Sequence, residues 1–239
     1  MHYFLTPLHT HIDFGFGATG DAFKEAADKL DAVLPERGGV LSEQLPINYL
    51  RRHAIELFLK SAIVIIHRRL QLPYGSIPHS GEPNALVNGK WVPFPKLHSV
   101  KALWTYLSEL FHDQKHFFDN IQRVDWSFPK EVDEWVDEIE AKDPRSTFFR
   151  YPNPRDTATD VPKAVMAEGT PEEIAARLAA SEHGPKQFIL LMENQSGEVM
   201  GGYYYAGDSL RHFNRVLKEC VDMFFGTHAA LRAEVCGGA

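Results

Sequence analysis

The sequence predicts a mainly α protein: an antiparallel up-and-down helical bundle with a small β-hairpin inserted late in the chain. Apolar residues recur every three or four positions in most long segments, which is typical of helices with one buried face. Residues 48–70 are apolar around most of the helical circumference and therefore predict a central, buried helix. A strand pattern is concentrated around residues 188–205. We expect a single domain, 1–239, with an insertion at about 156–207.

The first half of the chain predicts two helices and a long connection. Residues 21–35 carry apolar residues at helical spacing and end at Pro35, which cannot continue a helix. The central helix over 48–70 follows. Residues 71–95 are rich in proline and glycine, so we expect a long loop there.

The second half predicts more helices and the hairpin. Ser99 is a suitable N-cap, Thr170 and Glu173 form a capping box, and Gly226 is a typical helix end. Helices are expected over 99–111, 129–140, 170–183 and 209–225, and strands over 188–192 and 199–205.

The chain is acidic, with a formal net charge of −7. It therefore lacks the overall positive field that drives non-specific binding to nucleic acids, and any contact with RNA needs a local basic cluster. No apolar run is long enough to cross a bilayer, and the N-terminal segment lacks the pattern of a signal peptide. The two cysteines are too few for a disulfide scaffold. We therefore expect a cytoplasmic protein that does not enter a membrane.

Three ionisable residues interrupt the apolar surface of the central helix. His53, Glu56 and Lys60 stand three and four positions apart, so they project from one face. Glu56 comes four residues before Lys60, which is the favourable order for a helical ion pair. The pair is either a surface pair on a narrow exposed stripe or part of a polar seam, where buried charges need partners. His98 stands just before the N-cap of the next helix, where its neutral form is favoured.

Three segments resemble the HEPN superfamily, a group of helical bundles named for nucleotide binding. They are RRHAIELFLKSAI (residues 51–63), LHSVKALWTYL (97–107) and STFFRYP (146–152). Glu56 and Lys60 fall in an E-L-x-L-K pattern similar to that of the first long HEPN helix, and His98 resembles the histidine that opens the second. The resemblance covers about residues 45–155 and the last helix. It implies an antiparallel bundle, a homodimer, and a setting in prokaryotic toxin–antitoxin or antiviral systems.

The ribonuclease motif of active HEPN proteins is missing from its usual place. Those proteins have an arginine, then four to six intervening residues, then a histidine, near the start of the last long helix. Here Arg211 and His212 are adjacent, and Arg177 and His183 have the matching spacing but lie further upstream. With His98, these are the candidate catalytic residues of an alternative hypothesis, a metal-independent ribonuclease. An arginine would stabilise the negative charge of the phosphorane while a histidine moves a proton.

The leading hypothesis is a HEPN-like protein that binds a nucleotide, RNA or a protein partner and lacks the standard ribonuclease pair. Arg145, Arg150 and Arg155 lie in one short loop with aromatic residues, and guanidinium groups bind phosphate in a bidentate manner. We expect Arg150 and Lys60 to contact phosphate. The expected ligand groove is lined by His53, Glu56, Lys60, His98, Arg150 and Tyr151. A third hypothesis is an interaction module whose hairpin, within 186–205, adds a strand to a partner.

Two histidine-containing segments have spacings found in metal sites. His9 and His11 with Asp13 resemble the motif that opens barrel hydrolases, but the chain has too little strand pattern for a βα barrel. His112 and His116 are about one helical turn apart, as in HExxH zinc sites, but no third ligand is identifiable. We therefore predict no metal and no cofactor.

Overall fold

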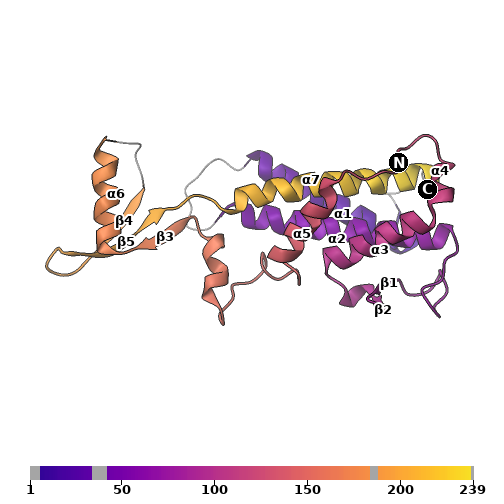
Figure 1. Ribbon diagram of the computed structural model, residues 1–239, viewed down its shortest axis with the longest axis horizontal. Coiled ribbons are helices and arrows are strands. Elements are labelled where there is room, and N and C mark those ends of the chain that lie inside the picture. Colours follow the sequence, from indigo (N-terminus) through magenta and orange to yellow (C-terminus); the bar gives the residue numbers. More distant parts are fainter. Residues whose placement is uncertain (1–5, 34–41, 184–187, 238–239) are drawn as a thin grey trace. The chain divides into compact units, whose positions relative to one another are not determined.

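The computed structural model describes residues 6–33, 42–183 and 188–237, apart from the side chains of residues 181–183. The described chain is mainly α-helical, as predicted, with two small antiparallel sheets (Figure 1). The helices are α1 (Phe16–Val33), α2 (Gln44–Arg69), α3 (Val100–Asp113), α4 (Lys115–Asp119), α5 (Glu131–Lys142), α6 (Pro171–His183) and α7 (Leu210–Ala230). The strands are β1 (Asn84–Val87), β2 (Lys90–Pro93), β3 (Met166–Gly169), β4 (Ile189–Glu193) and β5 (Val199–Tyr205).

The described residues fall into two compact units. The first comprises residues 6–33, 46–151 and 214–237, and the second comprises 42–45 with 152–183 and 188–213. The insertion expected at about 156–207 thus falls within the second unit. Within the described ranges, no helix combines the length and the apolar character needed to cross a bilayer.

Helix α2 is the core of the first unit. Almost every residue from Arg51 to His67 is buried, as the apolar circumference of this segment predicts. Gly20 brings α1 close to α2, because a Cβ there would lie 3.0 Å from a ring carbon of Phe58. Phe58 also packs edge-on against Phe225 of α7, with ring centroids 5.7 Å apart. Figure 1 shows α1, α2 and α7 running alongside one another.

Helix α3 packs against α5 and α7. Ser99 is its N-cap, as predicted, and its Oγ accepts the backbone N–H of Ala102 at 3.0 Å. Trp104 donates its indole N–H to Asp133 of α5 at 2.7 Å and packs edge-on against Phe224 of α7. The acidic residues of α5 otherwise lie mostly on its exposed side, away from its buried Val132, Val136 and Ile139.

The connection expected over 71–95 contains a hairpin, so the expectation of one long loop there is wrong. Strands β1 and β2 pair antiparallel. The turn between them is formed by Asn88 and Gly89, both with positive φ (49° and 74°), which is the favoured Asn-Gly hairpin turn. This dipeptide, between Ala85-Leu86-Val87 and Trp91-Val92, was the sequence signal for it.

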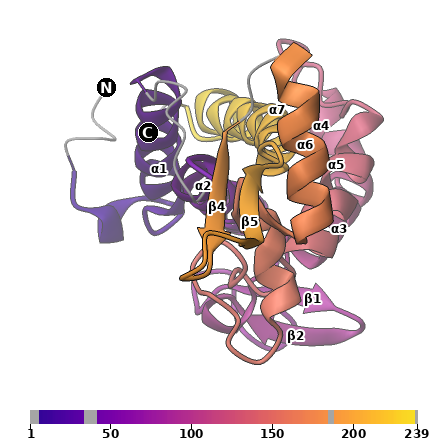
Figure 2. The same ribbon diagram turned by 90° about the vertical axis from the view of Figure 1, so that its left-hand side faces the viewer.

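The second unit holds a three-stranded sheet rather than a single hairpin. β4 and β5 pair antiparallel around a turn at 194–197, as predicted, and β3 adds a third strand on the other side of β5. α6 covers one face of this sheet (Figure 2), with Ile174 against Gly169 and Gly202. Thr170 and Glu173 form the predicted capping box, with reciprocal bonds of 3.0 and 3.3 Å. The single-hairpin prediction is therefore corrected to a three-stranded sheet.

Helix α7 does not end at Gly226, and this prediction is wrong. The helix continues to Ala230 and then into a π-helical turn over Leu231–Val235. Phe224, His228 and Leu231 are buried, so the inward-facing stripe extends past the glycine. The packing of this extra turn outweighs the cost of a helical glycine, which is about 1 kcal/mol.

Candidate functional site

Glu56 lies in a buried charge cluster, which we call the Glu56 cluster: Arg52, Glu56, Lys60 and Asp143. All four side chains are buried. One Glu56 oxygen accepts from Lys60 Nζ at 2.7 Å, and the other lies 2.6 Å from an Arg52 nitrogen. Lys60 also donates to the carbonyl of Phe94 at 3.0 Å. The polar residues of α2 thus form a buried seam rather than a surface pair, with two cations balanced by two carboxylates.

The charge of Glu56 is stabilised by its two cationic neighbours. Burial alone would raise the pKa of this carboxyl, but the charges and hydrogen bonds of Lys60 and Arg52 outweigh burial and hold the pKa below its ordinary value. Glu56 is therefore an ionised acceptor at neutral pH.

Arg52 and Asp143 connect α2 to the loop over residues 143–151. Arg52 Nε lies 3.5 Å from Asp143 Oδ2, and the guanidinium also donates to the carbonyl of His98. The other Asp143 oxygen accepts the backbone N–H groups of Thr147 at 2.7 Å and Phe148 at 3.0 Å. The buried carboxylate therefore holds the backbone turn that leads to Arg150.

His98 forms a carboxylate–histidine pair with Glu56. Its Nδ1 lies 3.1 Å from Glu56 Oε1, and its side chain is 45% exposed. Because the Glu56 carboxylate only accepts, Nδ1 carries the proton and Nε2 carries the lone pair when the ring is neutral. His98 is therefore the member of this group that solvent reaches.

His53 lies on the same face of α2 but does not bond to Glu56. Its ring packs edge-on against Phe23 at 4.6 Å between centroids and stacks parallel to Tyr49 at 6.0 Å. Burial, aided by the positive charges of Arg52, Lys60 and Arg150, lowers the pKa of His53 despite the opposing charge of Glu56. The half-buried ring is therefore neutral at pH 7.

Arg150 and Tyr151 are exposed at the end of this loop. The Arg150 guanidinium lies 5.8 Å from the ring centroid of Tyr49 and 5.7 Å from that of Tyr151. Its Nε donates to the carbonyl of Ser146. Two aromatic rings and a backbone bond thus restrict the guanidinium while leaving it accessible.

The six residues expected to line a groove lie in one region, but some are accessible and others are buried. Glu56 and His98 are in contact, and Lys60 bonds to Glu56. Tyr49 is near both His53 and Arg150. We call the accessible part the Arg150 surface: Tyr49, His53, His98, Arg150 and Tyr151. Lys60 is buried with its ammonium held by Glu56 and Phe94, so it positions other groups and does not face a ligand.

The other candidate catalytic residues belong to the second unit. Arg177 lies over the ring of Tyr204, 3.4 Å from its centroid. Arg211 and His212 are exposed in the first turn of α7. His183 ends α6, and its side chain lies outside the described residues. His98, by contrast, lies in the first unit, where its ring contacts the carboxylate of Glu56.

Asp13 and His11, from the first segment considered as a metal site, have other partners in the described structure. Asp13 accepts the backbone N–H groups of Gly15 and Gly17 at 3.1 and 2.8 Å and caps the start of α1. His11 bonds through its ring to Thr6. Over the described ranges, no three His, Cys, Asp or Glu residues converge as a metal site would require.

A buried Ser, His and Asp group also involves Asp13. Ser61 donates to Asp13 at 2.6 Å, and His228 Nδ1 lies 2.9 Å from Ser61 Oγ. Burial lowers the pKa of His228 to about 4 against the opposing charge of Asp13, so the ring is neutral and Nδ1–H donates to Ser61. The serine proton therefore points to the carboxylate and not to a base, which is the reverse of a catalytic triad. All three side chains are buried, so this group stabilises the fold.

No protein-family model matches this chain, and no curated protein or solved structure matches it either. The HEPN resemblance therefore remains a prediction.

Sequence reasoning missed Arg52, Asp143 and Tyr49 as parts of the site. Arg52 stands four residues before Glu56, so the helical spacing that indicated Lys60 could also have indicated it. Asp143 and Tyr49 had no such signal, because their roles depend on how the loop after α5 packs on α2.

Proposed function

We propose that the Arg150 surface binds the phosphate of an RNA or nucleotide, in a HEPN-like helical bundle. The observation that carries the proposal is Arg150 itself, an exposed arginine bordered by two tyrosine rings and fixed to the backbone at Ser146. A guanidinium whose conformation is already restricted loses less entropy when it binds phosphate.

The aromatic neighbours supply the second element of nucleic-acid recognition. Tyr151 is 61% exposed, and bases of single-stranded RNA stack on aromatic side chains of this kind. His53 adds a half-buried neutral ring beside Tyr49. The net charge of −7 makes such a local arrangement necessary, because the chain as a whole repels phosphate.

The proposal is tested by titrating a fluorescein-labelled oligouridine, and separately ATP, with the wild type, Arg150→Ala and Arg145→Ala. Arg145 is the matched control, because it is an exposed arginine of the same loop. A charge-assisted hydrogen bond contributes about 1.5–3 kcal/mol, so Arg150→Ala should weaken binding by about tenfold or more. Arg145→Ala should stay within about twofold of the wild type. Equal affinities for all three proteins would contradict the assignment.

The second candidate function is metal-independent cleavage of RNA, which the Glu56–His98 pair favours. His98 Nε2 would take the proton of a ribose 2′-hydroxyl as the 2′-oxygen attacks phosphorus. The bond to the 5′-oxygen then breaks, and that oxygen takes up a proton, which gives a 2′,3′-cyclic phosphate and a 5′-hydroxyl. Arg150 would stabilise the negative charge on the phosphoryl oxygens.

Cleavage is tested with the same RNA in the presence of chelator. The wild type should give a 2′,3′-cyclic phosphate, and His98→Ala should lose the activity. His112→Ala is the matched control, since His112 is an exposed histidine of the following helix and lies outside the Arg150 surface. RNA that stays intact with the wild type leaves binding without catalysis as the function.

The HEPN resemblance also leads us to propose a homodimer in the cytoplasm, in a prokaryotic toxin–antitoxin or antiviral setting. Light scattering of the full chain should give twice the mass of 27.1 kDa. A monomer at micromolar concentration would contradict this part of the proposal.

A further inference from the structure

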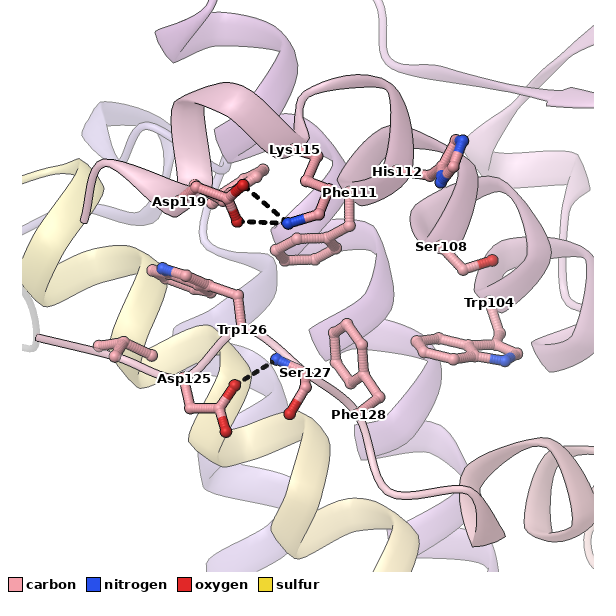
Figure 3. Close-up of a pocket in the computed structure, with 12 residues that line it drawn as sticks. Trp104, Ser108, Phe111, His112, Lys115, Asp119, Asp125, Trp126, Ser127 and Phe128 are labelled. Atoms are coloured by element: carbon pink, nitrogen blue, oxygen red, sulfur yellow. Dashed lines mark hydrogen bonds and ion pairs between the residues drawn. The ribbon is translucent and has the colours of Figure 1, made fainter. Parts of the chain in front are cut away.

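A cavity of about 480 Å³ lies among α3, α4 and the segment that leads to α5, all within the first unit (Figure 3). This volume is in the range of pockets that hold small organic molecules, about 300–1,000 Å³. None of its lining residues belongs to the Arg150 surface or to the Glu56 cluster.

The walls of the cavity are a connected set of aromatic rings. Phe111 contacts Phe118 and Phe128, with ring centroids 4.4 and 5.2 Å apart. Trp104 packs edge-on against Phe128 at 4.9 Å, and Trp126 lies 5.9 Å from Phe111. These contacts place the rings side by side along the wall of the cavity.

The charged groups at the cavity favour a cation. Asp119 is paired with Lys115 at 2.6 Å, so these two charges balance each other. Asp125 accepts the backbone N–H of Ser127 at 2.9 Å, and within the described part of the chain it has no ion pair with a cationic side chain. Hydrogen bonds from Ser127 lower the pKa of Asp125, so its carboxylate is ionised at neutral pH. Figure 3 shows Asp125 beside Trp126 and Ser127 at one side of the cavity.

Trp104 also favours a cation in the cavity. Its indole N–H donates to the carboxylate of Asp133 at 2.7 Å. A carboxylate bound to the indole N–H increases the electron density of the ring, and tryptophan is already the aromatic side chain that attracts cations best. An anionic ligand would meet the negative ring faces and Asp125 together.

We propose that this cavity is a binding site for a small organic cation, a compound that carries an ammonium group on an apolar or aromatic body. The ammonium lies near Asp125 and Trp126, and the apolar body fills the space along Phe111 and Phe128 toward Trp104. This site is independent of phosphate binding at the Arg150 surface.

The test uses phenyltrimethylammonium, with the neutral tert-butylbenzene and the anionic 4-tert-butylbenzoate as isosteric comparisons. Calorimetry and the quenching of tryptophan fluorescence both report binding, since Trp104 and Trp126 line the cavity. The cation should bind at least about tenfold more tightly than either comparison. Asp125→Asn should weaken the cation about fivefold and leave the neutral compound unchanged. Asp113→Asn is the matched control, because Asp113 is exposed at the end of α3 and does not line the cavity.

A second variant keeps the test independent of Asp125. Ser108 lines the cavity from α3, and Ser108→Lys places an ammonium of the protein there. This variant should lose binding of the cation while its circular dichroism stays that of the wild type. Equal binding of the cation and the neutral compound, or no binding of the cation at millimolar concentration, would overturn the proposal.

Discussion

Substitution of Glu56 and Lys60 tests whether the Glu56 cluster is a balanced set of buried charges. Glu56→Met leaves Arg52 and Lys60 facing the single carboxylate of Asp143, and Lys60→Met leaves two carboxylates facing Arg52. Each single variant therefore has one uncompensated buried charge. The double variant keeps Arg52 with Asp143, and its charges balance again.

The expected magnitudes follow from that balance. Removing one partner of a buried ion pair costs about 3–5 kcal/mol, because the other charge stays buried without compensation. Replacing both partners by well-packed apolar side chains of similar volume is often nearly neutral. We therefore expect each single variant to lose about 3–5 kcal/mol of unfolding free energy and the double variant to lose less than either. His98 adds little to the cost of Glu56→Met, since its side chain is 45% exposed.

Urea unfolding followed by tryptophan fluorescence is the suitable assay. All four tryptophans, at positions 91, 104, 126 and 135, belong to the first unit, so the signal reports the unit that contains the cluster. The pKa of Glu56 is lower in the folded protein, so its stabilisation is present above its ordinary pKa of 4.5 and is lost as the pH falls through the folded value. Glu56→Met should lack this loss.

Additive free energies would refute the reasoning. If the double variant loses the sum of the two single losses, Glu56 and Lys60 do not compensate each other's burial. Losses below about 1 kcal/mol in the single variants would mean that the cluster is hydrated.

Three further predictions concern other parts of the described chain. In urea unfolding, Gly17→Ala should lose at least about 1–3 kcal/mol of stability, because its Cβ would lie 2.0 Å from a ring carbon of His228. Gly226→Ala is the control, since the space around this helical glycine is open, and it should gain about 0.5–1 kcal/mol. Unfolding free energy should fall as the pH drops from 6.5 to about 4, because His228 takes up a proton at higher pH in the unfolded chain than in the folded chain. His228→Gln should reduce the slope of unfolding free energy against pH, and an unchanged slope would contradict the neutral buried ring. Asp143→Ala should weaken oligouridine binding as much as Arg150→Ala does, because it releases the turn at Thr147 and Phe148 that leads to Arg150. Binding at the wild-type level would show that the turn does not depend on this carboxylate.

Local rules predicted the long helices and the N-terminal caps at Ser99 and Thr170. Ser99 and the Thr170–Glu173 box were identified from residue type and spacing, because a cap depends on neighbours within four positions. The Glu56–Lys60 pair was predicted for the same reason. Gly226 shows the limit of such rules, since the buried residues that extend α7 past it contact other helices.

The remainder of the site depends on contacts distant in sequence. Glu56 lies 42 residues from His98, and Arg52 lies 91 residues from Asp143. No periodicity relates these positions, so the sequence could name most of the residues but not their burial. It therefore assigned phosphate contact to Lys60, which the fold directs to Glu56.

The salt dependence of RNA binding tests the central claim most directly. Each phosphate contact with single-stranded RNA contributes about 0.7 to the slope of the logarithm of the binding constant against the logarithm of salt concentration. We predict that Arg150→Ala lowers the magnitude of this slope by about 0.7 for oligouridine and that Arg145→Ala leaves it unchanged. An unchanged slope for Arg150→Ala would contradict phosphate binding at this arginine.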